Sequence, residues 1–325
     1  LADPERTAMF VTSRGITNET YYAAGKVMRY LGSPHVDNSA RLCHSPSTTG
    51  LNKTLGVAAT TCSYRDFYEA DLIVFFGSNP ANDQPVVTKY LDEAKKRGAR
   101  ILQVNAFREP GMRRYWVPSS LRSALFGTKI CDRDYLVRVG GDLAFLNAVA
   151  KVLISRKAWK EDFVQEAVEG FEEWKATLDE QDLDELCRGA GTTRKEVESF
   201  ASEIENADKG IFVWSMGITQ HVHGAETVAA IVNIGLLREF VGRPGCGMMP
   251  IRGHSGVQGG AEMGAYATSL PGGLPVNSVN AAYFSDLWEF PVPEEPGMTT
   301  VEALEAAGKG ELDAFYCIGG NFLAT

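Results

Sequence analysis

The residues best suited to metal or redox chemistry are two neighbours, Cys43 and His44, within the segment 41–47. A cysteine beside a basic group can ionise easily, and its thiolate can bind a soft metal. Taken alone, such a cysteine is more often structural. Support for a metal site must therefore come from the rest of the chain.

A second group of reactive side chains lies in a glycine-rich segment, 245–276, that shows no clear helical or strand periodicity. Long irregular segments in a compact chain are usually functional or disordered. We favour a functional loop, because Arg252 and His254 stand among its glycines and could be directed at a ligand.

Two histidines, His221 and His223, flank Val222 shortly after an apolar run at 211–214. An H-x-H pair can bind a metal. No third ligand is near them in the sequence, so we expect these histidines to be hydrated or hydrogen-bonded instead.

Polar and glycine residues follow three of the expected strands directly, at 77–84, 105–108 and 140–142. In open α/β sheets, ligands bind at the carboxyl ends of the strands, where glycine lets the backbone approach a phosphate and a helix N-terminus offers free N–H groups. Singly, these segments are explained as turns and caps. Three of them in successive strand–helix units favour a nucleotide site. The sequence has no G-x-G-x-x-G motif, which argues against ordinary NAD binding.

The elements that must position these residues alternate between strand and helix. Near-continuous apolar runs predict buried parallel strands. Strands are expected at 8–12, 71–76, 100–104, 135–139, 211–214 and 314–318, and helices at 18–31, 85–96, 143–155, 226–240 and 301–307, with a largely helical stretch at 159–207. This alternation predicts an α/β fold with two doubly wound, mostly parallel-sheet, Rossmann-like domains.

Composition narrows the class of protein. The chain has 325 residues, 44% hydrophobic and 22% charged, which is enough for two domains with a large core. Its net charge of -9 argues against a nucleic-acid-binding surface. No apolar run approaches the roughly 20 residues that cross a bilayer. The six cysteines are scattered without a CxxC pair, which argues against a self-contained zinc or iron–sulfur site and favours a reducing, cytoplasmic location.

Five segments together resemble one family, the molybdopterin oxidoreductases that carry two pyranopterin guanine dinucleotides, and its formate dehydrogenase branch in particular. They follow one another in the family's order, and the resemblance extends from about Ala8 to Phe322. The segments are Ser13-Arg14-Gly15-Ile16-Thr17-Asn18-Glu19, Arg41-Leu42-Cys43-His44-Ser45-Pro46, Phe76-Gly77-Ser78-Asn79-Pro80-Ala81, Gly217-Ile218-Thr219-Gln220 and Pro250-Ile251-Arg252-Gly253-His254-Ser255-Gly256-Val257-Gln258-Gly259.

The resemblance implies catalytic roles for three residues. Cys43 occupies the position of the cysteine or selenocysteine that ligates molybdenum or tungsten. His44 matches the histidine thought to handle the substrate proton. Arg252 matches the arginine that positions a small anionic substrate, which is formate in formate dehydrogenase.

The resemblance also implies a set of cofactor-binding residues. His254 stands where well-known formate dehydrogenases tend to carry Gln, which places the chain in a different subgroup. The residues expected around one guanine dinucleotide are Gly77, Asn79, Asp83, Asn105, Arg108, Gly141 and Asp142, and those expected in a loop that contacts the pterin are Met216, Gly217, Ile218 and Gln220.

A particular domain organisation follows. We expect one α/β domain at 39–250, carrying the metal-ligand cysteine, and a second built from 1–38 and 251–325. The family's N-terminal domain, which holds a 4Fe–4S cluster, and its C-terminal β-rich domain are not encoded here. We therefore expect a fragment that is inactive and cofactor-free alone, with the missing domains and an electron-transfer subunit as partners.

Two alternatives remain. One is a non-catalytic electron-transfer or scaffold subunit of the same fold, and the other is a nucleotide-dependent enzyme without metal. The enzyme interpretation predicts that Cys43, His44 and Arg252 converge at the mouth of a cleft between the two domains. It also predicts a guanine dinucleotide across the strand ends at Gly77, Asn105 and Gly140, with Asp142 either accepting from guanine or merely capping its helix.

Overall fold

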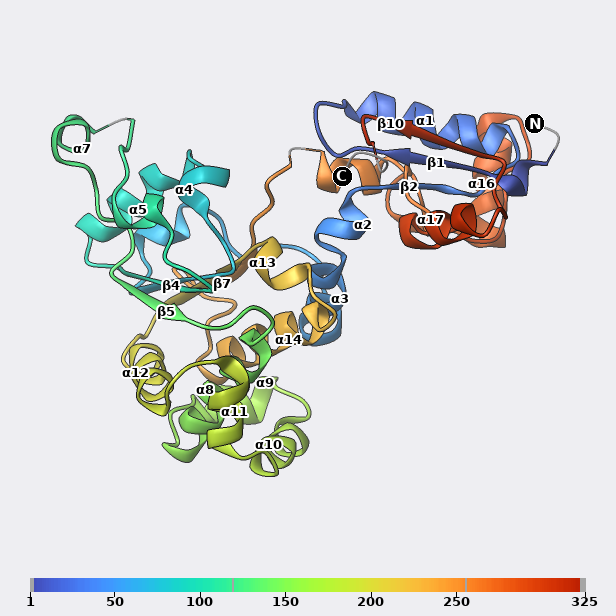
Figure 1. Cartoon of the computed structure of the whole chain (residues 1–325). Helices are drawn as coiled ribbons and strands as arrows, with labels where there is room; N and C mark the ends of the chain where they lie inside the picture. Colours follow the sequence, from blue (N-terminus) through green and yellow to red (C-terminus); the bar gives the residue numbers. More distant parts are fainter. Residues whose placement is uncertain (1–2, 119, 255, 322–325) are drawn as a thin grey trace. The chain divides into compact units, whose positions relative to one another are not determined.

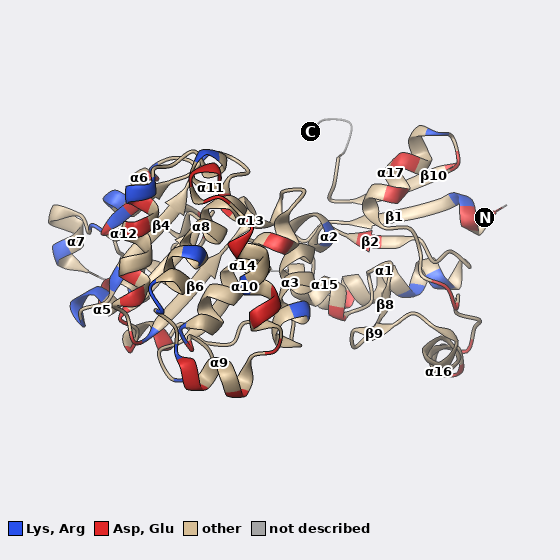
Figure 2. Cartoon of the chain, turned by 90° about the horizontal axis from the view of Figure 1, so that it is seen from below, with Lys and Arg blue, Asp and Glu red and all other residues tan. Residues whose placement is uncertain are grey.

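The computed structural model describes residues 3–118, 120–254 and 256–321, and the chain divides into two compact units (Figure 1). The first unit is Leu1–Ser45 with His254–Thr325, and the second is Pro46–Gly253. Ser255 and Phe322, both part of the resemblance described above, lie outside the described residues. Along the ribbon, Lys and Arg residues are interspersed with Asp and Glu residues in both units (Figure 2).

The second unit is built on a five-stranded parallel sheet in the order β5-β4-β3-β6-β7. Four of its strands were expected from the apolar runs. The fifth, β7, was missed because it lies in the glycine-rich segment, where the absent Cβ of Gly247 leaves room for the Cys62 side chain. The strands are β3 (Leu72–Phe76), β4 (Arg100–Asn105), β5 (Arg133–Leu136), β6 (Gly210–Trp214) and β7 (Gly247–Pro250).

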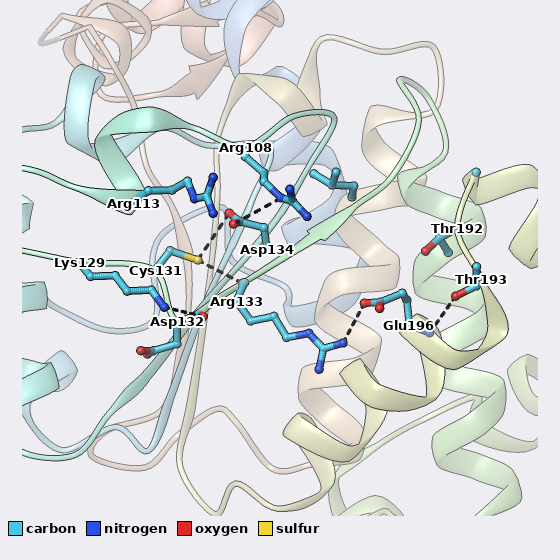
Figure 3. A pocket seen from close by; sticks show the side chains of 12 residues that line it. Arg108, Arg113, Lys129, Cys131, Asp132, Arg133, Asp134, Thr192, Thr193 and Glu196 are labelled. Atoms are coloured by element: carbon cyan, nitrogen blue, oxygen red, sulfur yellow. Dashed lines mark hydrogen bonds and ion pairs between the residues drawn. The ribbon is translucent and has the colours of Figure 1, made fainter.

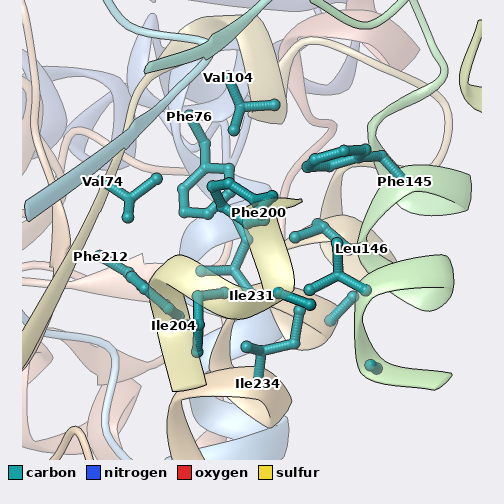
Figure 4. Packing of buried hydrophobic residues seen from close by; sticks show 14 of the residues in the cluster. Val74, Phe76, Val104, Phe145, Leu146, Phe200, Ile204, Phe212, Ile231 and Ile234 are labelled. Atoms are coloured by element: carbon teal, nitrogen blue, oxygen red, sulfur yellow. The ribbon is translucent and has the colours of Figure 1, made fainter. Parts of the chain in front are cut away.

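Helices cover both faces of this sheet, as a doubly wound fold requires. Successive side chains of a strand point to opposite faces. Accordingly Val74 and Phe76 pack with Phe145 and Phe200 in one core (Figure 4), while Ile73 and Phe75 belong to a second core with helix α5. The helices are α3 (Ser45–Leu55), α4 (Pro80–Asp83), α5 (Val87–Lys96), α6 (Pro110–Arg113), α7 (Leu121–Phe126), α8 (Asp142–Ser155), α9 (Glu161–Ala167), α10 (Phe171–Asp179), α11 (Leu183–Ala190), α12 (Arg194–Glu205), α13 (Met216–Thr219) and α14 (Gly224–Leu237).

The first unit contains a smaller parallel sheet in the order β10-β1-β2. Phe10 pairs with Cys317 and Met9 with Tyr316, so the strand before the Ser13 segment and the strand ending at Ile318 share one sheet, as expected. The elements are β1 (Thr7–Val11), α1 (Asn18–Tyr30), β2 (Val36–Asn38), α2 (Ala40–Cys43), α15 (Val257–Glu262), the hairpin β8 (Ser269–Leu270) and β9 (Leu274–Pro275), α16 (Ser278–Trp288), α17 (Thr300–Gly308) and β10 (Ala314–Ile318).

The division between the units differs from the expected boundary near residue 39. Cys43 lies in the first unit instead of with the nucleotide-binding part. The reason is local: α2 follows β2 almost directly, and Asn38 fixes the connection by accepting from the Ala40 N–H at 2.8 Å and donating to the Ala265 carbonyl at 2.6 Å.

Close packing explains several glycines of the segment 245–276. A Cβ at Gly256 would collide with Tyr21, and a Cβ at Gly259 would collide with Asn18. A Cβ at Gly260 would lie 3.2 Å from the side-chain amide nitrogen of Asn38. These glycines let α15 pack closely against its neighbours. Glycine is a poor helix former, so α15 could not be predicted from its local pattern. No helix in the described part of the chain is long and apolar enough to cross a membrane.

Candidate functional site

The carboxyl ends of all five strands of the second unit meet at one edge of the sheet. The Gly77 N–H donates to Val104 O at 3.0 Å, and the Val137 N–H donates to Asn105 O at 3.1 Å. On the other side, the Ile251 N–H donates to Trp214 O at 2.9 Å, so β7 delivers Arg252 to this same edge. The side-by-side arrangement of strand ends on which the nucleotide-site prediction depended is confirmed.

At this edge, the backbones of two glycines contact each other directly. Gly77 adopts a φ of +51°, and its carbonyl accepts from the Gly217 N–H at 3.0 Å. A Cβ at Gly77 would lie 2.7 Å from the Gly217 carbonyl carbon, and one at Gly217 would lie 2.6 Å from Gly77 O. The backbones after β3 and β6 therefore touch, which only glycine at both positions allows.

A buried carboxylate, Glu109, joins the segments after β3 and β4. Asn79 donates to it at 2.6 Å and Asn105 at 3.2 Å, so two predicted residues meet through a third. Burial raises the pKa of Glu109, with a smaller contribution from Asp83. Glu109 was not predicted from the sequence, although its position four places after Asn105, beyond a strand end, is a usable signal.

Several buried polar atoms near the end of β3 have no hydrogen-bond partner among the described residues. They are Ser78 Oγ, Asn79 Oδ1, both side-chain amide atoms of Gln84, and Gln103 Oε1. Gln103 uses its amide nitrogen to donate to the Ser78 carbonyl at 2.8 Å, which ties two of these residues together. Because buried polar groups are nearly always satisfied, this cluster indicates a place where a polar ligand supplies the missing partners.

Asp142 is buried at the start of α8, with 9% of its surface exposed. The N-cap of α8 is Gly141, and no side chain caps the helix, so Asp142 is not the cap. Burial raises the pKa of Asp142 to about 6, with His221 opposing the shift. Gly141 is needed for packing, since a Cβ there would lie 2.9 Å from Ala190 O.

Replacing Asp142 with asparagine should stabilise the cofactor-free protein at pH 7 by on the order of 2 kcal/mol. The folded-state pKa lies above the unfolded one, so the native carboxyl binds its proton more tightly. The cost of the charged form is therefore absent below about pH 4 and grows as pH rises through about 6. Urea unfolding of both proteins at pH 4 and pH 7 measures this difference, and an equal or lower stability of Asp142→Asn at pH 7 would contradict it.

The remaining predicted residues of the second unit fall in different environments. Ile218 is 1% exposed and belongs to the hydrophobic core, so its side chain is not available to a cofactor. Ile218 therefore packs α13 against the hydrophobic core, while Gly217 and Gln220 on the same segment are exposed, as is Asp83.

Arg108 lines a separate, basic cleft of about 570 Å³ beside the edge strand β5 (Figure 3). Its guanidinium Nε lies 4.0 Å from Asp134, and Arg133 forms an ion pair with Glu196 at 3.0 Å. Arg113 and Lys129 add further positive charge to the wall. Among the predicted cofactor residues, Arg108 is the one that lines this cleft. The cleft is therefore distinct from the cluster of buried polar atoms at the end of β3.

In the first unit, Cys43 is the last residue of α2 and His44 follows it, and both are buried. His254, also in this unit, accepts a hydrogen bond from Arg14 at 2.7 Å. Arg252 belongs to the second unit, and the convergence of Cys43, His44 and Arg252 stays a prediction. Over the described residues, no group of three or more His, Cys, Asp or Glu could hold a metal. The charge of His221 lowers the pKa of Asp142 and so opposes the effect of burial.

Fold and site define a class: an α/β protein with two parallel sheets, whose strand ends offer buried polar groups to a ligand. The particular family follows from the sequence. The family model described as "Molybdopterin oxidoreductase" matches residues 2–325, so the chain belongs to the molybdopterin oxidoreductase family. This family in general implies a molybdenum or tungsten ion held by a pair of pterin cofactors.

Individual relatives agree with this assignment. "Protein YdeP" of Escherichia coli K12 is 30% identical over 99% of this chain, and "Putative formate dehydrogenase YrhE" of Bacillus subtilis is 33% identical over 95% of it. The chain spans 43% and 30% of the lengths of these two relatives. Among solved structures, acetylene hydratase from Pelobacter acetylenicus matches 98% of the chain with a TM-score of 0.67 at 17% identity, which shows the shared fold.

Proposed function

We propose that this chain is part of the catalytic subunit of a molybdenum or tungsten bis-pterin enzyme that oxidises formate or a similar small anion. The observation that carries the proposal is the cluster of buried polar atoms without partners at the end of β3, beside the Gly77–Gly217 contact. Such a surface fits a ligand that is large and rich in donors and acceptors. Family membership makes a pterin guanine dinucleotide the first choice.

The residues at the strand ends would hold this cofactor. Ser78, Asn79 and Gln84 can satisfy the polar edges of the dinucleotide, and Gly77 with Gly217 keeps the surface free of side chains. Asp142, a desolvated carboxylate that accepts but does not donate when ionised, suits the N1–H and amino donors of guanine. Burial raises its pKa, so a hydrogen-bond donor beside this carboxylate would stabilise its charged form.

Three residues are proposed for the reaction. When bound, the metal–pterin group supplies a two-electron acceptor of the type that oxidoreductases of this family use. Arg252 would orient the substrate anion, because its planar guanidinium is permanently charged and matches a carboxylate. His44 would take the proton, since the ordinary pKa of histidine lies near neutrality.

For formate, the balanced change is the loss of one proton and two electrons to give carbon dioxide. In this proposal, Cys43 would hold the metal through its thiolate, and a neighbouring iron–sulfur cluster would supply the onward path for the electrons. The name of YrhE supports formate as the first substrate to test. Acetylene hydratase shares the fold, and its name describes a hydration, so the fold alone does not select the reaction.

The test is metal and pterin analysis of the complete polypeptide that contains this chain, followed by formate-dependent reduction of a dye. We expect about one molybdenum or tungsten and two pterins per subunit, and dye reduction that requires formate. A subunit with neither metal nor pterin would favour a scaffold or electron-transfer role. Binding of a free nucleotide without metal would point to a nucleotide-dependent enzyme instead.

A further inference from the structure

Two loops of the first unit meet around His254. One follows β1 and carries Ser13 and Arg14, and the other precedes α15. The Gly256 N–H donates to Ser13 O at 3.2 Å, and a Cβ at Gly256 would collide with Tyr21. The Tyr21 hydroxyl in turn donates to Thr12 O at 2.8 Å. These contacts hold the backbones of the two loops together next to the Arg14–His254 pair.

The hydrogen bond between Arg14 and His254 fixes the form of the imidazole. Arg14 Nε lies 2.7 Å from His254 Nε2. An arginine side chain donates and never accepts, so Nε2 must be the acceptor and must be unprotonated. The proton of the neutral ring is then on Nδ1. Burial and the neighbouring Arg14 charge both lower the pKa of His254, which keeps the ring neutral.

The other ring nitrogen faces no acceptor in the described part of the chain. His254 Nδ1 is buried there without a hydrogen-bond partner, and so is the hydroxyl of Ser13 on the facing loop. A buried donor left unsatisfied costs about 1–3 kcal/mol, so isolated cases of this kind call for a ligand. Both atoms belong to one unit, and both are held by the loop contacts described above.

We propose that Arg14 is a positioning residue that holds His254 as the Nδ1–H tautomer, so that His254 donates a hydrogen bond to an acceptor atom of the bound pterin cofactor. In this form the ring presents an acceptor to Arg14 and a donor to the ligand. A glutamine side chain offers the same pair, with its oxygen toward Arg14 and its amide N–H toward the ligand. This equivalence gives a physical reason why His254 can stand where related formate dehydrogenases tend to carry Gln.

The inference rests on the proposed function, and its test measures cofactor release from the complete polypeptide by pterin fluorescence, without an activity assay. In His254→Ala, we expect the rate of pterin release to rise about tenfold, the effect of one hydrogen bond. In His254→Gln, the rate should stay within about twofold of the wild type, because the donor and acceptor are both kept. Equal rates in wild type and His254→Ala would overturn the proposal.

The role of Arg14 has its own signature in the pH profile of release. In the wild type, His254 should add no inflection at or above the ordinary pKa of histidine, and any inflection from Asp142 should be common to all variants. In Arg14→Gln, the charge that lowers the pKa of His254 is gone while its burial remains, so the pKa should rise and the profile should gain an inflection at higher pH than in the wild type. The double variant Arg14→Gln/His254→Gln should lose that inflection, which assigns it to His254. An Arg14→Gln profile identical to that of the wild type would contradict the positioning role.

The outcomes separate the two proposals. A complete wild-type subunit without pterin refutes the proposed function itself. A subunit that holds pterin but releases it equally fast in wild type and His254→Ala leaves the function standing and refutes only the role of this pair.

Discussion

Replacing Cys43 with alanine in the complete polypeptide should reduce formate-dependent dye reduction by more than about 100-fold. Partners that only support a metal ligand typically cost about 10–100-fold when removed, and loss of the proposed ligand itself should exceed that range. Cys43 is 3% exposed at the end of α2. Removing one sulfur from this position leaves a small cavity, so the variant should remain folded.

The matched control is Cys246→Ala. Cys246 is also buried, at 2% exposed, but it lies before β7 in the second unit, and burial raises the pKa of its thiol. This variant loses the same atom from a similar environment and should keep activity within about twofold. Activity in Cys43→Ala close to that of Cys246→Ala would show that Cys43 is a structural cysteine, the interpretation that its sequence context favours when taken alone.

Features of the fold that depend on local pattern were predictable. Leu72 to Phe76 is apolar at every position because the strand is covered on both faces, and such runs are difficult to mistake for anything but a buried strand. The glycines at the ends of helices were equally informative, since Gly32 and Gly98 adopt the positive φ that ends a helix. These signals act over a few residues and need no tertiary information.

Features that depend on contacts between distant residues were not predictable. Glu109 gains its position from Asn79, 30 residues away in the sequence, and Arg14 gains its role from His254, 240 residues away. Neither pairing can be read from the local pattern, although the position of Glu109 beyond a strand end marks it as a candidate residue. The same limit applies to the unit boundary, because the hydrogen bond from Asn38 to Ala265 places α2, and Cys43 with it, in the first unit.

The Gly77–Gly217 contact allows the most direct test of the strand-end site. Gly217→Ala would place a Cβ 2.6 Å from Gly77 O, a backbone atom that cannot move without shifting the end of β3. Overpacking of this kind costs about 1–3 kcal/mol, and a clash between two backbones belongs at the upper end. For a protein of this size, we expect a fall in Tm of about 4–5 °C.

Because Gly217 does not adopt a positive φ, the clash is the only cause of the expected loss. Gly308→Ala is the control, since Gly308 is helical and has no atoms within 4 Å of an added Cβ. That variant should be as stable as the wild type or slightly more so. In the complete polypeptide, Gly217→Ala should also lose most of its pterin, measured by fluorescence, because the displaced segments after β3 and β6 carry the polar atoms proposed to hold the dinucleotide. Normal Tm and normal pterin content in Gly217→Ala would show that the backbone contact does not shape the site.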